Sequence, residues 1–156
     1  MEAIHLLKYT KKTSLTKPLS ELAKKTFFKI WDVGSIDMMI SVPLHMKRLR
    51  QRGFNQAHLL TMSWARQEGI PLDGVTLCRS RWTEPQTNLS RTERRKNIKG
   101  AFSLRHPEKI KGQRILLVDD VFTTGATVNE CARVLTRAGA ESVDVLTLAR
   151  AVWGYR

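Results

Sequence analysis

The sequence has few of the residues that mark disulfide-bonded, metal-binding or membrane-spanning proteins. Its 156 residues include only two cysteines and four histidines, and these are scattered rather than grouped at the spacing of a zinc site. The longest apolar runs are only a few residues, and residues 1–12 lack the apolar core of a secretory signal. We therefore expect a cytoplasmic protein with no membrane insertion, whose two cysteines are packed thiols.

Acidic residues are also scarce. The chain has 27 Lys and Arg against 14 Asp and Glu, which gives a formal net charge of +13. Such a field attracts polyanions, and charge alone does not choose between a pyrophosphorylated sugar and a nucleic acid. Many of the cations are concentrated in two segments, residues 47–52 and 91–99. The hydrophobic content of 42% is ordinary, so one domain with a real core is expected.

One stretch, residues 115–127, carries most of the recognisable chemistry. Four apolar residues, 115–118, predict a fully buried strand, and two aspartates follow at its C-terminal end. A turn rich in small and hydroxyl-bearing residues then opens a helix with apolar residues at helical spacing. In order, this stretch after the strand reads Asp119, Asp120, Val121, Phe122, Thr123, Thr124, Gly125, Ala126 and Thr127.

The position of these residues indicates a ligand. In a parallel sheet, ligands lie outside the carboxyl ends of the strands, and the free N–H groups of a helix N-terminus bind anions. The backbone amides and Thr hydroxyls of residues 122–127 suit a monophosphate, whereas Asp119 and Asp120 suit a vicinal diol. A site for a phosphate beside a site for a vicinal diol indicates that the ligand is a ribose 5-phosphate. The alternative, an acidic turn before a Thr-capped helix, needs only one hydroxyl and leaves the acid pair and Gly125 unexplained.

A second candidate segment follows the first predicted strand, residues 38–42. Four cations lie within residues 47–52, and Gly53 lets the backbone turn before a helix predicted over 55–68. We predict a basic loop that grips a diphosphate. The alternative is a merely solvated basic loop.

A long polar segment, residues 79–100, lies between strands predicted at 75–78 and 101–104. Structureless segments of this length inside compact domains are usually functional lids or disordered. We expect a flexible lid with a short helix over 90–96. A flexible basic insertion without function is the alternative.

The whole pattern predicts a single α/β domain over residues 1–156. Residues 1–36 form an N-terminal arm and an amphipathic helix over 20–31, and residues 142–149 predict a last strand. The helix after the central motif is expected to end near Ala138. The fold class is a mostly parallel sheet with helices on both faces and the site at the strand C-termini.

The central motif of four hydrophobic residues, two acids and Thr-Thr-Gly resembles the signature of the type I phosphoribosyltransferases. A closer resemblance, covering nearly the whole chain, is to the ComF family, also described as competence or amidophosphoribosyltransferase-like proteins. It is carried by Val42-Pro43-Leu44-His45 and Arg50-Gln51-Arg52-Gly53-Phe54-Asn55-Gln56-Ala57. ComF-type proteins commonly begin with a cysteine-rich zinc ribbon, and no such cysteines precede this domain, so we expect a truncated or a ribbon-less copy.

The resemblance implies a protein that binds phosphoribosyl pyrophosphate (PRPP) with Mg²⁺ and transfers the phosphoribosyl group to an unknown acceptor, with release of pyrophosphate. It makes Asp119, Asp120 and the lid residue Arg94 the catalytic candidates. The turn at 121–127 becomes the 5-phosphate loop, and the metal is expected through the ligand, near the two aspartates. The implied pyrophosphate loop comprises Pro43, Leu44, Lys47, Arg48, Arg50 and Arg52.

The resemblance also supports a different class of function. A non-catalytic ComF-type protein would act in DNA uptake and competence, through single-stranded DNA or competence proteins. A plain nucleic-acid-binding module is a further alternative, for which only Phe54, Trp82 and Phe102 supply aromatic rings near the basic runs. Neither the acceptor nor the oligomeric state follows from the sequence.

Overall fold

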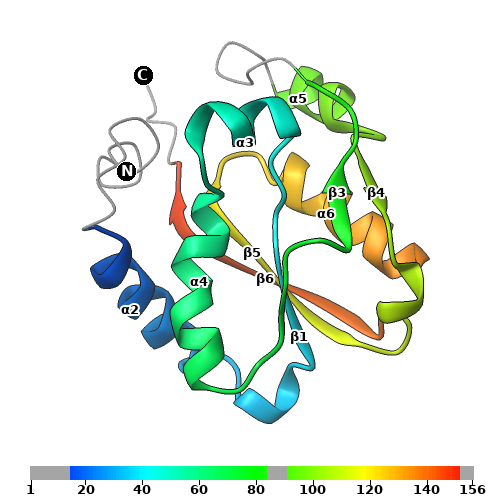
Figure 1. Ribbon diagram of the computed structural model, residues 1–156. Coiled ribbons are helices and arrows are strands. Elements are labelled where there is room, and N and C mark those ends of the chain that lie inside the picture. The colour runs from blue at the N-terminus through cyan, green and yellow to red at the C-terminus, as the bar shows by residue number, and fades with distance from the viewer. Residues whose placement is uncertain (1–14, 84–90, 152–156) are drawn as a thin grey trace.

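A parallel sheet forms the centre of the structure, a computed structural model that describes residues 15–83 and 91–151 (Figure 1). Most of the predicted N-terminal arm and the centre of the predicted lid lie outside these ranges. All three neighbouring strand pairs of the four-stranded sheet run parallel, which confirms the predicted fold class. In spatial order the strands are β2 (Leu72–Asp73), β1 (Met38–Ser41), β5 (Arg114–Phe122) and β6 (Ser142–Arg150).

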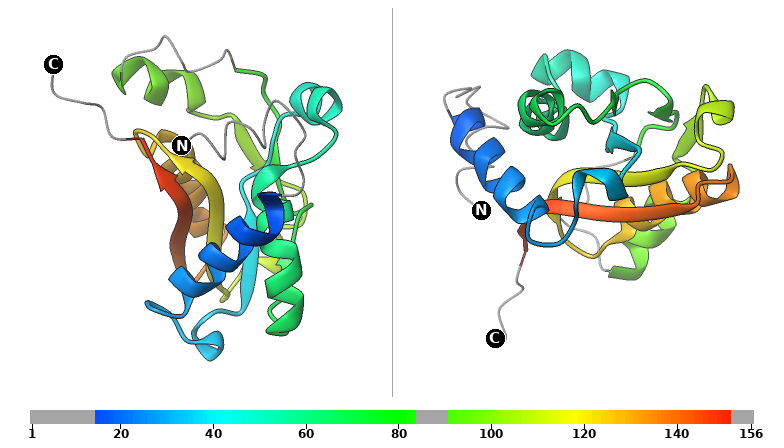
Figure 2. Two further views of the ribbon diagram at one scale, coloured as in Figure 1. Left: turned by 90° about the vertical axis from the view of Figure 1, so that its left-hand side faces the viewer. Right: turned by 90° about the horizontal axis from the view of Figure 1, so that it is seen from below.

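Helices cover both faces of this sheet, as predicted (Figure 2). Helices α2 (Thr16–Phe27) and α4 (Gln56–Gln67) pack on one face, and α6 (Ala126–Arg137) packs on the other. Helix α4 buries Ala57, Leu60, Thr61, Trp64 and Ala65, which recur at helical spacing. Among the described residues, no helix has both the length and the apolar character that a bilayer crossing requires.

Strand β5 is apolar on both sides because both sides are buried. Successive side chains of a strand point to opposite faces. Ile115 and Leu117 belong to the core under α6, whereas Leu116 and Val118 belong to the core under α2 and α4. All four side chains are at most 1% exposed. The continuous hydrophobic run is therefore the pattern expected of a central parallel strand.

Leu116→Ala is expected to lower the free energy of unfolding by about 2–5 kcal/mol, because it deletes a fully buried side chain. Urea denaturation measures the change. Val75→Ala is the control, since Val75 is 57% exposed and its truncation should cost no more than about 0.5 kcal/mol. Equal, small losses in both variants would contradict the two-sided core.

Helix α2 begins and ends four residues earlier than the predicted range of 20–31. Its start at Thr16 leaves Pro18 in the first turn, where the missing proline N–H costs no hydrogen bond. The Trp31 ring folds back and stacks on Phe27, with ring centroids 5.9 Å apart. The apolar residues at the end of the predicted helix therefore belong to the turn after it. A short 3-10 helix, η2 (Val33–Ser35), leads into β1.

A separate two-stranded antiparallel sheet lies at the two ends of the predicted lid. The strand predicted at 75–78 begins two residues later and lies outside the parallel sheet, which the sequence did not predict. The short helix predicted over 90–96 is present. The elements are β3 (Leu77–Arg79), α5 (Arg91–Ile98), β4 (Phe102–Leu104) and the 3-10 helix η4 (Pro107–Lys109).

The predicted basic loop after β1 is mostly a helix, α3 (Met46–Arg52), so the prediction of a loop was wrong there. Local capping explains the helix. The His45 side chain accepts a hydrogen bond from the Lys47 amide at 3.2 Å. At the other end, Gly53 adopts φ = 84° and its amide donates to the Leu49 carbonyl at 2.7 Å. The four cations are therefore presented on one short helix.

An ion pair ties the start of β5 to the segment before β1. The Asp37 carboxylate accepts hydrogen bonds from the Arg114 backbone amide at 2.8 Å, from Nε at 3.0 Å and from Nη2 at 2.6 Å. The Arg114 side chain is the main reason that the pKa of Asp37 falls from 3.8 to about 2. The charged form of Asp37 therefore stabilises the folded state.

Because the pKa of Asp37 is lower in the folded state, its contribution to stability is present above pH 3.8 and is lost as the pH falls toward about 2. We expect Asp37→Asn to be less stable than wild type near neutral pH, and this difference to shrink below pH 3.8. Urea denaturation over a pH series measures it. The exposed Asp32 supplies the control, Asp32→Asn. A difference between Asp37→Asn and wild type that is independent of pH would contradict the role of the charge.

Candidate functional site

The two predicted ligand segments lie at the same edge of the sheet. Strands β1 and β5 are adjacent and parallel, with Ser41 opposite Val118. The Val42 amide extends this pairing by donating to the Val118 carbonyl at 2.8 Å. Pro43 and Leu44 follow directly. Figure 1 shows α3 at the same edge as the turn that leads from β5 into α6. This is the edge at which the sequence predicted a site.

The turn between β5 and α6 is shorter than predicted. Strand β5 continues beyond the two aspartates to Phe122, which pairs with Arg150, so the turn is confined to residues 123–125. Gly125 has φ = 76°, in the left-handed region, and is the N-cap of α6. A Cβ atom on Gly125 would lie 2.9 Å from Cζ of Phe122. The backbone conformation therefore favours glycine, and any other residue would also have to displace the Phe122 ring.

A glycine cap leaves the start of α6 suited to an anion. The first N–H groups of a helix have no acceptor within the helix, and Gly125 has no side chain to offer one. Thr124 Oγ1 accepts from the Ala126 amide at 3.4 Å, beyond the usual range for such a bond. The alternative of a Thr-capped helix thus depends on one long contact. The hydroxyl-bearing residues of the turn, Thr123 and Thr124, and of the start of α6, Thr127, are all half-buried.

The two aspartates differ in their surroundings. Asp119 is half-buried and its Oδ1 accepts from the Asp120 amide at 2.9 Å, while Asp120 is only 8% exposed. Strand alternation turns their side chains to opposite faces, with Asp119 on the α6 side. Asp119 interacts electrostatically with Cys131 of α6 and with Arg79, in agreement with this placement. A ligand that contacts both carboxylates must therefore reach across β5, beyond the end of β1 at Ser41.

The start of α3 is in contact with the segment that follows β3. Lys47 Nζ and Arg48 Cζ lie 5.6 Å and 5.5 Å from the centroid of the Trp82 ring. The His45 ring meets the same indole at 5.3 Å. Arg52 instead donates to Gln56 of α4 at 3.2 Å. Of the predicted pyrophosphate residues, Lys47 and Arg48 are thus grouped beside the lid, and Arg50 is exposed.

Arg79, which sequence reasoning missed, lies between the candidate segments. It is the last residue of β3, and its guanidinium lies over the Phe102 ring at 5.6 Å and donates to Thr83. Burial is the largest cause that lowers the pKa of Arg79 to about 10, and repulsion from Arg48 adds to it, while Asp119 acts in the opposite direction. The charge of Arg79 therefore interacts both with Asp119 and with Arg48 of the pyrophosphate segment. In the sequence it was only the first residue of a basic lid.

Arg94, the predicted lid arginine, lies on the buried side of α5 and is 4% exposed. Its proposed contact with a ligand stays a prediction. Cys131 is fully buried, and burial raises the pKa of its thiol well above the usual value, which agrees with a packed thiol. Within residues 15–83 and 91–151, no three His, Cys, Asp or Glu side chains gather as a metal-binding group.

Comparison with solved structures defines the class of fold. The chain is similar to the glutamine phosphoribosylpyrophosphate amidotransferase from Bacillus subtilis, with a TM-score of 0.57 and 20% identity. The match covers 86% of this chain and 26% of the amidotransferase chain. The fold is that of the type I phosphoribosyltransferases, as the sequence predicted.

Sequence comparison then defines the family. Residues 58–153 match the phosphoribosyl transferase domain, and the chain belongs to this family. Competence protein F of Haemophilus influenzae is 41% identical over 116 residues, which are 74% of this chain and 51% of the relative. DNA utilization protein YhgH of Salmonella typhi is 37% identical over 150 residues, 94% of this chain and 65% of the relative. These names confirm the resemblance to ComF, and the chain spans only part of each relative's length.

Proposed function

We propose that this chain binds PRPP with Mg²⁺ at the carboxyl edge of β1 and β5 and transfers its phosphoribosyl group to an acceptor, releasing pyrophosphate. The observation that carries the proposal is the turn at Gly125. It combines a left-handed glycine cap, an open helix start and two aspartates just upstream, in a chain of the phosphoribosyl transferase domain family. The reaction is proposed to be cytoplasmic, where free thiols such as Cys78 and Cys131 persist.

The turn is the main anchor for the ligand. Amides at the start of α6 and the hydroxyls of Thr123, Thr124 and Thr127 donate to the 5-phosphate. Each hydrogen bond to a charged group contributes roughly 1.5–3 kcal/mol, so three or four account for about micromolar affinity. Asp119 and Asp120 accept from the two ribose hydroxyls across β5, beyond the end of β1.

In the proposed transfer, the bond from the anomeric carbon to the pyrophosphate oxygen breaks, and the pyrophosphate leaves with the electron pair. The acceptor's lone pair forms the new bond to that carbon. Positive charge develops on the ribose beside Asp119 and Asp120, and negative charge develops on the leaving group near Lys47 and Arg48. Arg94 is assigned to the lid, which excludes water as a competing nucleophile.

The residues present fit a magnesium ion held mainly by the ligand. Carboxylate oxygens are ligands that Mg²⁺ prefers, and Asp119 and Asp120 supply them at the edge where the diphosphate would lie. When bound, the ion would neutralise charge on the leaving diphosphate.

Calorimetric titration with PRPP, with and without Mg²⁺, tests the proposal. Ribose 5-phosphate is the control ligand, because it has the phosphate and the diol but no diphosphate. We expect magnesium-dependent binding of PRPP that is tighter than binding of ribose 5-phosphate. If PRPP produces no heat in calorimetry and no shift in thermal unfolding, the proposed function is contradicted.

A second candidate function is a non-catalytic role in DNA uptake through single-stranded DNA or competence proteins. The net charge of +13 supports it, as do relatives named competence protein F and DNA utilization protein. Single-stranded DNA affinity that falls with salt and survives Asp120→Asn, together with no response to PRPP, would favour this candidate over the transferase.

A further inference from the structure

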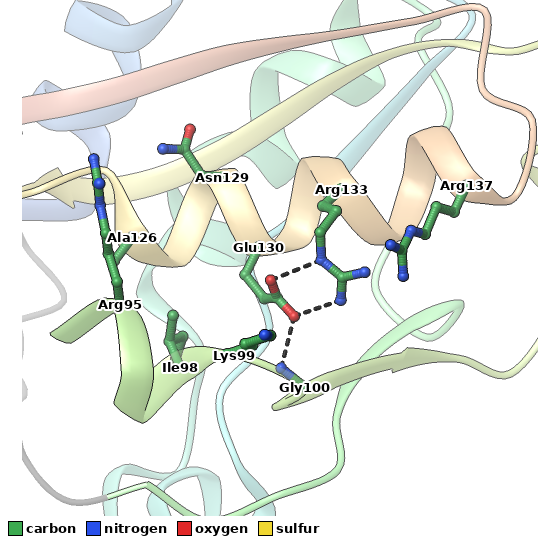
Figure 3. A pocket seen from close by; sticks show the side chains of 9 residues that line it. All are labelled: Arg95, Ile98, Lys99, Gly100, Ala126, Asn129, Glu130, Arg133 and Arg137. Carbon is green, nitrogen blue, oxygen red and sulfur yellow. Dashed lines mark hydrogen bonds and ion pairs between the residues drawn. The ribbon is translucent and has the colours of Figure 1, made fainter. Parts of the chain in front are cut away.

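A cavity of about 460 Å³ lies between α6 and the segment that joins α5 to β4 (Figure 3). It is of the size that holds small organic ligands. One wall comes from the lid segment and the other from the side of α6. Its lining residues are Arg95, Ile98, Lys99 and Gly100, and Ala126, Asn129, Glu130, Arg133 and Arg137.

The polar side chains of this cavity form two rows. Arg95 and Lys99 are four residues apart on the lid wall, and Asn129, Arg133 and Arg137 are four apart along one side of α6. Figure 3 shows the two rows coming from different elements around the same space. Two separate segments of the chain thus bring four cations to one cavity.

Among the described residues that line the cavity, the one acid is already engaged. Glu130 is 7% exposed, and its carboxylate accepts from the Gly100 amide at 2.7 Å and from Arg133 Nε and Nη2 at 2.9 Å and 2.6 Å. These bonds, with the Arg133 side chain the largest cause, lower the pKa of Glu130, so it is charged near neutral pH. Glu130 therefore fixes the end of the lid segment to α6 and orients Arg133.

Four cations and one carboxylate leave three net positive charges around the cavity. Like charges four apart on a helix face repel, so this arrangement lowers the stability of the empty protein. A bound polyanion would offset that repulsion. Ile98 and Ala126 also line the cavity, but they are only 2% and 5% exposed, so they offer a ligand little apolar surface.

We propose that this cavity is a second ligand site, for a nucleotide-sized organic polyphosphate, beside the PRPP site. Arg95, Lys99 and Arg137 bind the phosphates. The row on α6 runs from Asn129 to Arg137, roughly 12 Å along the helix axis and away from the turn at Gly125. A bound ligand would contact both α5 and α6. Helix α6 begins at Ala126, directly after the turn at Gly125.

Calorimetric titration with uridine diphosphate tests the proposal, with uridine as the uncharged control. We expect uridine diphosphate to bind and uridine not to bind. Arg137→Glu should weaken uridine diphosphate binding at least tenfold and leave PRPP binding unchanged. Its side chain is exposed, so the fold should persist. Lys25→Glu, on α2 across the sheet, is the matched charge reversal and should change neither affinity.

Gly125→Val separates this site from the PRPP site, since it should still bind uridine diphosphate. Loss of uridine diphosphate binding in Gly125→Val, without loss in Arg137→Glu, would overturn the second site. No binding of uridine diphosphate to wild type would also overturn it. An oligothymidylate that binds wild type but not Arg137→Glu, when uridine diphosphate fails to bind, would assign the cavity to a nucleic acid backbone instead.

Discussion

Gly125→Val is expected to abolish detectable PRPP binding while the protein stays folded. The new Cβ would meet the Phe122 ring at 2.9 Å, and a β-branched residue is strained at φ = 76°. The turn must therefore change shape, and the amides at the start of α6 lose their common direction. If three or four phosphate hydrogen bonds are lost at roughly 1.5–3 kcal/mol each, affinity falls by more than about a thousandfold.

Gly112→Val is the matched control for Gly125→Val. Gly112 has nearly the same backbone conformation, φ = 71°, but a Cβ there would meet no heavy atom of the described residues within 4 Å. Strain at such positions is of order 1–3 kcal/mol, less than the stability of a typical domain. Both variants should lose similar stability in thermal unfolding, and only Gly125→Val should lose PRPP in calorimetry. Micromolar binding that persists in folded Gly125→Val would remove the turn from the site.

Asp120→Asn is expected to weaken PRPP binding by at least about a hundredfold. Loss of the charge turns a charge-assisted hydrogen bond to a ribose hydroxyl into a neutral one, and the amide group can present a donor where an acceptor is needed. Asp120 is 8% exposed, so water replaces the lost interaction poorly. Asp119→Asn should weaken binding as well, since the proposal assigns one hydroxyl to each carboxylate.

Asp144→Asn controls for the charge change, because Asp144 lies near the start of β6, opposite Leu116 and away from the carboxyl edge. Calorimetry with PRPP and Mg²⁺ measures all three variants. The account expects Asp144→Asn to bind as wild type does. If Asp120→Asn and Asp144→Asn bind PRPP equally well, the aspartates are not part of the site.

Elements whose structure depends on local pattern could be predicted from the sequence. Apolar periodicity located α4 and α6, and a continuous apolar run located β5. The density of positive charge in residues 47–52 was interpreted as a loop, although His45 and Gly53 cap that segment as a helix. Capping residues were a better guide there than charge.

The remaining features depend on contacts between distant segments. The sequence places Asp119 and Asp120 side by side, but only the strand pairing shows that β5 continues past them and turns them to opposite faces. Arg79 owes its importance to Phe102 and to the charges of Arg48 and Asp119, none of which is near it in the chain. The cationic cavity likewise needs α5 to pack on α6.

The most direct test of the central claim is hydrogen exchange of the backbone amides with and without PRPP and Mg²⁺. The account predicts that PRPP slows exchange at residues 123–127, and more weakly at 46–52, because the 5-phosphate and the diphosphate are bound there. Asp120→Asn should remove this protection. Slowed exchange confined to residues 95–100 and 129–137, or no change anywhere, would contradict the assignment of the PRPP site to the end of β5.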